Sequence, residues 1–206
     1  MANPVLGDPP RVSRFYRLVA GVYDRLRPLY AGFAPTREQY FSALSLEDDD
    51  RVLDVGCGTG ASTRRVVGAD RSVHGVDLSP AQLAYARTKP AVADVSFALG
   101  DATHLPYRDD AFDVVLSVGS LPYVPDVRTA LAEAHRVMVP DGRLLLVGPK
   151  TPDRVLARRV ADAVLRTFDP DSIASTCRSV GFTDVEMRTV HMDWLGRDAL
   201  VVTARA

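Results

Sequence analysis

The chain is poor in cysteine and has no long apolar run. Its two cysteines, Cys57 and Cys177, stand far apart and match neither a disulfide framework nor the spacing of a metal site. No stretch approaches the roughly 18 apolar residues needed to cross a membrane, and the start of the chain lacks the apolar run of a secretory signal. We therefore expect free thiols, no bound metal and a soluble protein in the reducing cytoplasm.

Net charge is also close to zero. The sequence has 25 lysines and arginines against 26 aspartates and glutamates, which disfavours a protein dedicated to nucleic acid. The N-terminal segment is the exception, because residues 9–40 carry six arginines, two acids and several aromatic residues. Two interpretations stay open for this segment: a helical lid with solvated arginines, which we favour, or a surface in weak contact with anionic lipid. Nothing in the sequence indicates an oligomeric state.

Length and pattern predict a single α/β domain. With 206 residues, 47% of them hydrophobic, the chain can bury one sizeable core. We divide it into a helical lid over 1–45 and a cofactor-binding core over 46–206. Within the core, strands and helices alternate as a parallel sheet requires. The expected strands lie at 51–55, 72–76, 95–99, 112–118, 143–147, 183–190 and 198–204, and the expected helices at 61–67, 80–87, 128–138, 155–168 and 171–180.

The most informative segment runs from Asp54 to Gly60. A buried strand stops here at Asp54-Val-Gly-Cys-Gly-Thr-Gly60, and the following residues open a helix. Glycines allow backbone to pack against a ligand and to adopt dihedrals that other residues resist. Asp77 ends the next strand, 23 residues after Asp54, and an acid about 20 positions beyond such a turn is placed to bind ribose hydroxyls. The sequence therefore predicts an adenosine-like ligand.

The glycine spacing distinguishes two classes of such ligands. Dinucleotide folds use G-x-G-x-x-G, which seats a pyrophosphate on a helix N-terminus, whereas this chain has G-x-G-x-G at Gly56, Gly58 and Gly60. It also lacks the G-K-[ST] ending of a phosphate-binding loop. The carboxylate of Asp54 would repel a pyrophosphate but suits an ammonium group. An NAD-dependent oxidoreductase is therefore the disfavoured alternative, and a non-catalytic cofactor-binding module is a second one.

Four motifs in order resemble those of class I S-adenosylmethionine-dependent methyltransferases. They occupy residues 53–60 (Leu-Asp-Val-Gly-Cys-Gly-Thr-Gly), 75–80 (Gly-Val-Asp-Leu-Ser-Pro), 100–115 (Gly-Asp-Ala-Thr-His-Leu-Pro-Tyr onward) and 136–144 (Arg-Val-Met-Val-Pro-Asp-Gly-Arg-Leu). The resemblance implies a Rossmann-like seven-stranded sheet, mostly parallel with the last strand antiparallel. It also implies a methyltransferase that binds S-adenosyl-L-methionine across the carboxyl ends of the strands.

Matched by position, the resemblance assigns residues to the methionine end of the cofactor. Four loop residues would wrap the methionine tail: Gly56, Cys57, Gly58 and Gly60. Asp54 would support the amino group of that tail. Ser117 and Val118, which end the fourth strand, would sit beneath the sulfonium.

The same matching assigns residues to the adenosine end. Asp77 would accept from the ribose hydroxyls, and Leu78 would lie against the adenine. Asp101 and Ala102 would face the adenine edge, with Asp101 accepting from the exocyclic amine. Asp113 opens the fourth strand, so we interpret it as a structural acid at the opposite edge of the sheet.

The nearest subgroup resembles the small-molecule and lipid-quinone methyltransferases of the methyltransferase type 11 group. Members often open with helices that contain a Tyr-Asp pair, here Tyr23-Asp24, and Tyr23 would reach the methionine end of the cofactor or pack within its helix. Quinone C-methyltransferases typically carry an Arg-Asn pair after the fourth strand, where this chain reads Ser117-Val-Gly-Ser-Leu. We expect a small hydrophobic acceptor: a quinone precursor, a lipid or another metabolite, methylated at carbon, oxygen or nitrogen.

The chemistry needs no protein nucleophile, because the sulfonium already activates the methyl group. Alignment of the acceptor alone can supply roughly 7–11 kcal/mol. A general base is required only where the acceptor must lose a proton. The candidates for a catalytic group are Tyr123, just past the fourth strand, and His191, at the end of the sixth.

Overall fold

A computed structural model describes residues 40–151, 167–191 and 198–206. These residues form one sheet of seven strands in the order β3-β2-β1-β4-β5-β7-β6. The strands are β1 (Arg51–Val55), β2 (Ser72–Asp77), β3 (Ser96–Leu99), β4 (Phe112–Val118), β5 (Met138–Pro149), β6 (Thr183–His191) and β7 (Asp198–Arg205). The predicted lid up to residue 39, including Tyr23, and residues 155–166 of a predicted helix lie outside the described residues.

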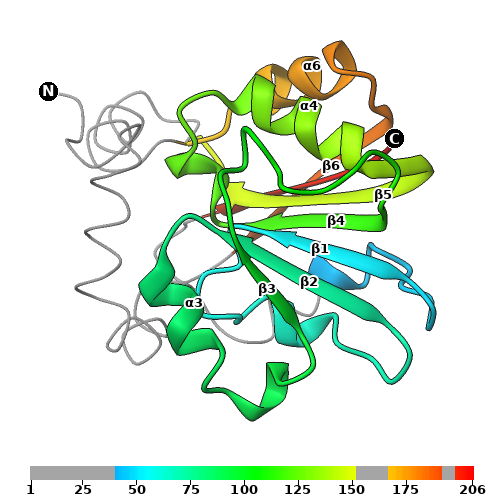
Figure 1. Ribbon diagram of the computed structural model, residues 1–206. Helices are drawn as coiled ribbons and strands as arrows, with labels where there is room; N and C mark the ends of the chain where they lie inside the picture. The colour runs from blue at the N-terminus through cyan, green and yellow to red at the C-terminus, as the bar shows by residue number, and fades with distance from the viewer. Residues whose placement is uncertain (1–39, 152–166, 192–197) are drawn as a thin grey trace, which may run out of the picture.

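Helices cover both faces of this sheet. Figure 1 shows α4 (Val127–Val137) and α6 (Pro170–Ser179) on one face and α3 (Pro80–Ala86) on the other. Each begins at a side chain that accepts a hydrogen bond from the first turn, which satisfies an otherwise unpaired amide; these residues are Ser79, Asp126 and Asp169. Among the helices of the described ranges, none is long and apolar enough to cross a membrane.

The pairing of the strands places the site. Strands β1 to β5 pair in parallel, while β7 is antiparallel to both β5 and β6. Val52 and Leu53 of β1 are both buried, in different hydrophobic clusters, as expected for a strand covered on both faces. Because parallel strands finish at one edge, β1, β2 and β4 bring Val55, Asp77 and Val118 to the same side of the molecule. The predicted α/β sheet, mostly parallel with its last strand antiparallel, is confirmed.

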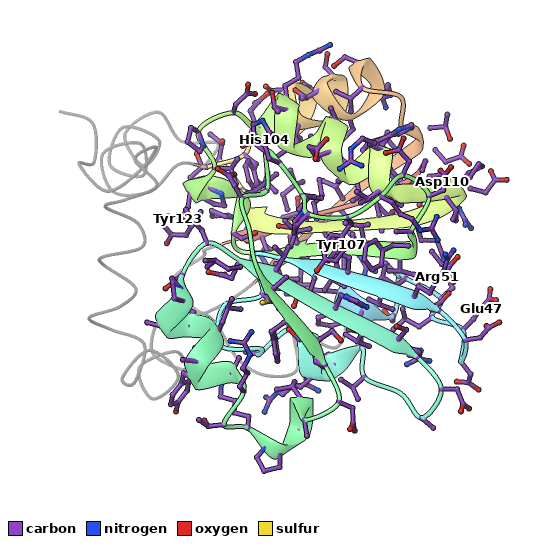
Figure 2. The ribbon with its side chains drawn as sticks, viewed as in Figure 1. Glu47, Arg51, His104, Tyr107, Asp110 and Tyr123 are labelled. Atoms are coloured by element: carbon purple, nitrogen blue, oxygen red, sulfur yellow. The ribbon has the colours of Figure 1, made fainter. Side chains whose placement is uncertain are left out.

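An ion pair fastens the opposite edge, where the strands begin. Nε and Nη2 of Arg51 each donate to a carboxylate oxygen of Asp113 at 2.8 Å, and the Arg51 backbone amide donates at 2.9 Å. The hydrogen bonds from the Arg51 side chain are the main cause of a lowered pKa at Asp113. Figure 2 shows Arg51 at the end of the sheet opposite Tyr123. Asp113 therefore holds the fold, as the sequence predicted.

The segment after the glycine loop differs from the prediction. Instead of a helix opening over 61–67, it forms a single 3-10 turn, η1 (Thr63–Arg65). The hydroxyls of Ser62 and Thr63 donate to Oδ2 of Asp54, which ties this segment to β1 in place of a regular helix. β-branched residues nearby disfavour a helix further.

Two other boundaries also differ from the prediction. Helix α4 ends at Val137 and β5 begins at once at Met138, five residues before the predicted start of this strand, with an irregularity in the β4–β5 pairing between Met138 and Arg143. Phe168, predicted as the end of a helix, is instead a bridge partner of Lys150. Its buried ring packs against Gly148, where a Cβ would lie 2.0 Å from Cε2 of Phe168.

Candidate functional site

A pocket opens at the edge where β1, β2 and β4 end. It contains about 1000 Å³ of empty space, counting its open mouth, which suits a ligand of cofactor size. The glycine loop forms one wall, and the segments that follow β2, β3 and β4 form the others. The lining residues with predicted roles are Gly56, Cys57, Gly58, Asp77, Leu78, Asp101, Ala102, Val118 and Tyr123.

The glycine loop is held by the neighbouring strand. The amides of Gly56 and Cys57 both donate to the carbonyl of Val76, at 2.8 and 3.1 Å. Gly56, Gly58 and Gly60 have φ angles of +72°, +54° and +76°, in the left-handed region where glycine is favoured. Each glycine therefore meets the backbone requirement that the sequence implied.

The three glycines nevertheless differ in what surrounds them. A Cβ on Gly56 would lie 2.2 Å from Cβ of Ser120, so this position has no room for a side chain. A Cβ on Gly60 would contact Val92 and Ala86 at ordinary distances, and Gly60 does not line the pocket. Its predicted contact with the methionine tail stays a prediction, while its described role is to turn the chain.

Asp77 presents a carboxylate to the pocket. Its Oδ2 accepts from the Gly58 amide and its Oδ1 from the Ser79 amide, both at 2.8 Å. An ionised carboxylate has about four acceptor sites, so each oxygen can still accept from a ligand. Burial is the largest influence on Asp77 and raises its pKa, although the two backbone amides oppose that shift. The geometry fits the predicted contact with a vicinal diol.

Asp54 lies behind the loop rather than on its pocket side. Its side chain is fully buried, and Oδ2 accepts from the hydroxyls of Ser62 and Thr63 at 2.8 and 2.7 Å. The described contacts therefore shape the segment after the loop. Support for the amino group of a methionine tail stays a prediction for Asp54.

The loop after β3 supplies Asp101 and Ala102. Oδ1 of Asp101 accepts from the Thr103 amide at 2.9 Å, which folds the start of the loop tightly. Arg136 of α4 fastens the rest by donating to the carbonyls of Leu105 and Tyr107, at 3.2 and 2.9 Å.

Glu133 completes this clamp on the loop. Its carboxylate oxygens accept hydrogen bonds from Nε and Nη2 of Arg136 at 2.7 and 2.8 Å. Its Oε2 also accepts a hydrogen bond from the Leu105 amide at 2.8 Å. The Arg136 side chain is the main cause of a lowered pKa at Glu133. The pair Arg136–Glu133 thus fixes a wall of the pocket from outside it.

The end of β4 is tied to the glycine loop through two hydroxyls. Ser120 donates to the carbonyl of Val55 at 2.9 Å, and the hydroxyls of Ser117 and Ser120 lie 2.5 Å apart. Since the Ser120 proton is committed to Val55, Ser117 is the donor between the two hydroxyls. Ser117 is buried and does not line the pocket, whereas Val118 does. Ser117 therefore lies behind the residues that line the pocket, rather than at the predicted position beneath the sulfonium.

The two candidate catalytic residues lie in different parts of the structure. Tyr123 follows β4 in the turn η3 (Leu121–Tyr123) and lines the pocket. His191 ends β6, which is three strands away from β4, and strands are spaced about 4.8 Å apart. His191 is exposed, contacts Asp198 at 2.6 Å through Nδ1 and is not part of the pocket lining. Tyr123 therefore lies at the pocket and His191 lies away from it, and a catalytic role stays a prediction for both.

Two polar residues of the site escaped the sequence interpretation. Ser120 was overlooked because its contact with Val55 crosses 65 positions of sequence. The sequence pattern predicts only that Gln82 belongs to a helix, although it lines the pocket and is 3% exposed. The motif Ser79-x-x-Gln82 was a usable signal, because it is a pattern of helix N-termini whose partners can be checked.

These residues fit S-adenosylmethionine better than a dinucleotide. Loop backbone without Cβ atoms allows close approach, and Asp77 and Asp101 offer carboxylates to hydroxyl and amine donors. Among the described lining residues there is no lysine or arginine, so a pyrophosphate would meet acidic groups without a compensating cation. The donor set therefore matches a ligand that pairs a nucleoside with a cationic amino-acid tail.

Comparison with known proteins agrees with this site. Residues 53–146 match the family described as "Methyltransferase domain". The chain is 32% identical over 183 residues to the 2-methyl-6-phytyl-1,4-hydroquinone methyltransferase of Arabidopsis thaliana, covering 87% of this chain and 54% of that protein. It is 34% identical over 149 residues to the demethylmenaquinone methyltransferase of Tropheryma whipplei, covering 71% and 62%. The chain thus spans between half and two thirds of the length of these relatives.

The fold is shared with solved structures as well. The crystal structure of the [4+2]-cyclase SpnF superposes with a TM-score of 0.83 at 21% identity, covering 99% of this chain and 98% of that one. At that identity the likeness shows the fold alone. The family match and the relatives lend no support to the oxidoreductase alternative. By its motifs, its sheet topology and its relatives, the chain belongs to the class I S-adenosylmethionine-dependent methyltransferases.

Proposed function

We propose that the protein transfers a methyl group from S-adenosylmethionine to a small hydrophobic acceptor of the quinol or phenol type. The observation that carries the proposal is the pocket at the ends of β1, β2 and β4, where Asp77 and the loop amides are organised around one ligand-sized space. The names of the relatives support the acceptor class, since both methylate quinone-related compounds by name.

The residues of the chain contribute binding and alignment. When bound, S-adenosylmethionine supplies a methyl group already activated by its sulfonium. Asp77 holds a nucleoside diol, while Gly58 presents backbone without a side chain to the ligand along the loop. Fixing two reactants in line can contribute roughly 7–11 kcal/mol. The protein thereby needs only to orient the acceptor and to exclude water.

The segment after β4 would form the acceptor side of the pocket. Val118, Val124 and Pro125 supply apolar surface there, and Tyr123 supplies a hydroxyl. Such a surface suits a flat, apolar ring that carries an oxygen substituent. Tyr123 is proposed to orient that oxygen. Where the methyl acceptor is already ionised, Tyr123 does not need to remove a proton from it.

The partner of the protein is proposed to be this small molecule and no nucleic acid, in keeping with the balanced charge of the chain.

A cytoplasmic, reducing setting is also proposed. Cys57 and Cys177 are both buried and unbridged, and burial is the largest cause of their raised thiol pKa values. Thiols of this kind are kept in a reducing compartment.

The test is a methyl-transfer assay on the full chain. S-adenosylmethionine with an isotopically labelled methyl group is incubated with a prenylated hydroquinone, with reduced demethylmenaquinone and with no acceptor, and products are resolved by mass spectrometry. Label in a quinol product supports the proposal, and Tyr123→Phe should lower turnover while leaving cofactor affinity unchanged. Tight binding of cofactor without label in any quinol would overturn the acceptor class. If an acceptor is converted but gains no label, the protein catalyses a reaction other than methyl transfer.

A further inference from the structure

Ser120 stands where the chain leaves β4 and enters the turn that carries Tyr123. Strand β4 ends at Val118, and Gly119 turns the chain with a φ of +78°. Ser120 follows as the N-cap residue of η3. A serine in this position normally accepts from an amide in the first turn of its own helix. Within η3 the Ser120 side chain makes no such bond, so its hydroxyl serves a contact elsewhere.

That contact reaches the start of the glycine loop. The Ser120 hydroxyl donates to the carbonyl of Val55 at 2.9 Å, and Val55 is the last residue of β1. The last pair of the ladder between β1 and β4 is Asp54 with Leu116, so this hydrogen bond joins the two segments beyond the end of the ladder. Ser117 supports the bond, because its hydroxyl lies 2.5 Å from that of Ser120 and leaves the Ser120 proton to Val55.

The main chain of Ser120 holds the other side of the pocket. Its carbonyl accepts from the Tyr123 amide at 3.0 Å, which closes η3 and fixes the position from which the Tyr123 side chain extends. Ser120 and Tyr123 both line the pocket. Ser120 therefore binds the cofactor side of the pocket through its side chain and the acceptor side through its carbonyl.

We propose that Ser120 is a positioning residue for methyl transfer, which fixes Tyr123 relative to the glycine loop and so aligns the acceptor with the methyl group. The inference rests on the proposed function, because it takes the acceptor to lie against Tyr123. In-line transfer is sensitive to distance, and a displacement of about 1 Å can lower a rate roughly 100-fold. Loss of the hydrogen bond to Val55 should therefore affect turnover more than it affects the binding of either ligand.

The experiment is a double-mutant cycle on the full chain with Ser120→Ala and Tyr123→Phe, assayed with a prenylated hydroquinone as acceptor. Ser120→Ala should lower kcat about 10-fold. The KM of the hydroquinone and the calorimetric affinity for S-adenosylhomocysteine should change less than about 2-fold. In the Tyr123→Phe background, the same change should lower kcat less than about 2-fold, because residues that act through one another are not additive.

Two further variants separate this role from a general loss of a serine. Ser179 is exposed at the end of α6, and its hydroxyl also donates to a backbone carbonyl, that of Thr176 at 2.8 Å. Ser179→Ala should therefore turn over at the wild-type rate. Ser117→Ala removes the support for the Ser120 bond and keeps both of its partners, so it should lower kcat by a smaller factor that disappears in the Tyr123→Phe background.

A purely structural Ser120 would give a different result. Ser120→Ala would then unfold at a lower temperature and turn over at the wild-type rate per folded molecule, which would overturn the inference. An equal loss from Ser120→Ala in wild type and in Tyr123→Phe would also overturn it, as would wild-type turnover in Tyr123→Phe alone. These outcomes leave the proposed function intact. A wild-type protein that transfers no label to any quinol would overturn both.

Discussion

Gly56→Ala and Gly119→Ala form a matched pair that isolates one contact of the glycine loop. Both glycines line the pocket, and their φ angles are nearly equal, +72° and +78°. Their surroundings are opposite. A Cβ on Gly56 would lie 2.2 Å from Cβ and 2.5 Å from Oγ of Ser120, whereas a Cβ on Gly119 would have nothing within 4 Å.

The difference between the two variants can be estimated from these distances. Each alanine in a left-handed conformation costs about 1–2 kcal/mol of stability, and this cost is common to both. Only Gly56→Ala must also displace Ser120, which introduces overpacking of about 1–3 kcal/mol. It further breaks the Ser120 hydrogen bond to Val55, worth about 0.5–1.5 kcal/mol. Gly56→Ala should therefore be less stable than Gly119→Ala by about 2–4 kcal/mol.

Urea denaturation of the ligand-free protein measures this difference directly. A double variant, Gly56→Ala with Ser120→Gly, removes the obstructing Cβ and should recover the steric part of the loss. Equal destabilisation by Gly56→Ala and Gly119→Ala would refute the contact as the reason for glycine at position 56. Failure of Ser120→Gly to improve the Gly56→Ala variant would refute it as well.

Three further predictions concern charged groups. Asp77→Asn should weaken S-adenosylhomocysteine about 10- to 150-fold by calorimetry, since a charge-assisted acceptor is worth about 1.5–3 kcal/mol. Arg136→Met should lower the free energy of unfolding by about 1–3 kcal/mol and weaken cofactor binding, because it releases the loop after β3; an unchanged affinity would refute the positioning role. The lowered pKa of Asp113 means that its stabilising effect is complete above the ordinary carboxyl pKa of about 4 and is lost as pH falls through the folded value. Asp113→Asn should therefore flatten the acid limb of stability against pH, as urea midpoints between neutral and acid pH would show, and leave affinity near neutral pH intact.

The strands and the glycine loop could be predicted because their signals are local. Four consecutive buried residues in β1 followed by a glycine turn leave few alternatives, and Asp77 stands at a spacing that the ribose contact dictates. The acid Asp113 was correctly separated from the cofactor residues because it opens β4 rather than ending it. Position along a parallel strand decides which edge a residue occupies.

The remainder depended on contacts that no local pattern contains. Where a helix is predicted after the loop, the chain forms a 3-10 turn, and the hydroxyls of Ser62 and Thr63 donate to Asp54. The role of Ser120 follows from its hydrogen bond to Val55, 65 positions earlier in the chain. These contacts join segments that are distant in sequence, so a local pattern does not contain them.

The glycine loop and Asp77 should bind S-adenosylmethionine rather than a dinucleotide. The most direct measurement is calorimetric titration of the full chain with S-adenosylhomocysteine and with NAD, on wild type and on Gly58→Val. Wild type should bind S-adenosylhomocysteine with micromolar affinity, about −8 kcal/mol, and should give no saturable heat with NAD. Gly58→Val should abolish binding, because a branched side chain disfavours the φ of +54° at this position. Saturable binding of NAD without binding of S-adenosylhomocysteine would show instead that the loop is a dinucleotide site.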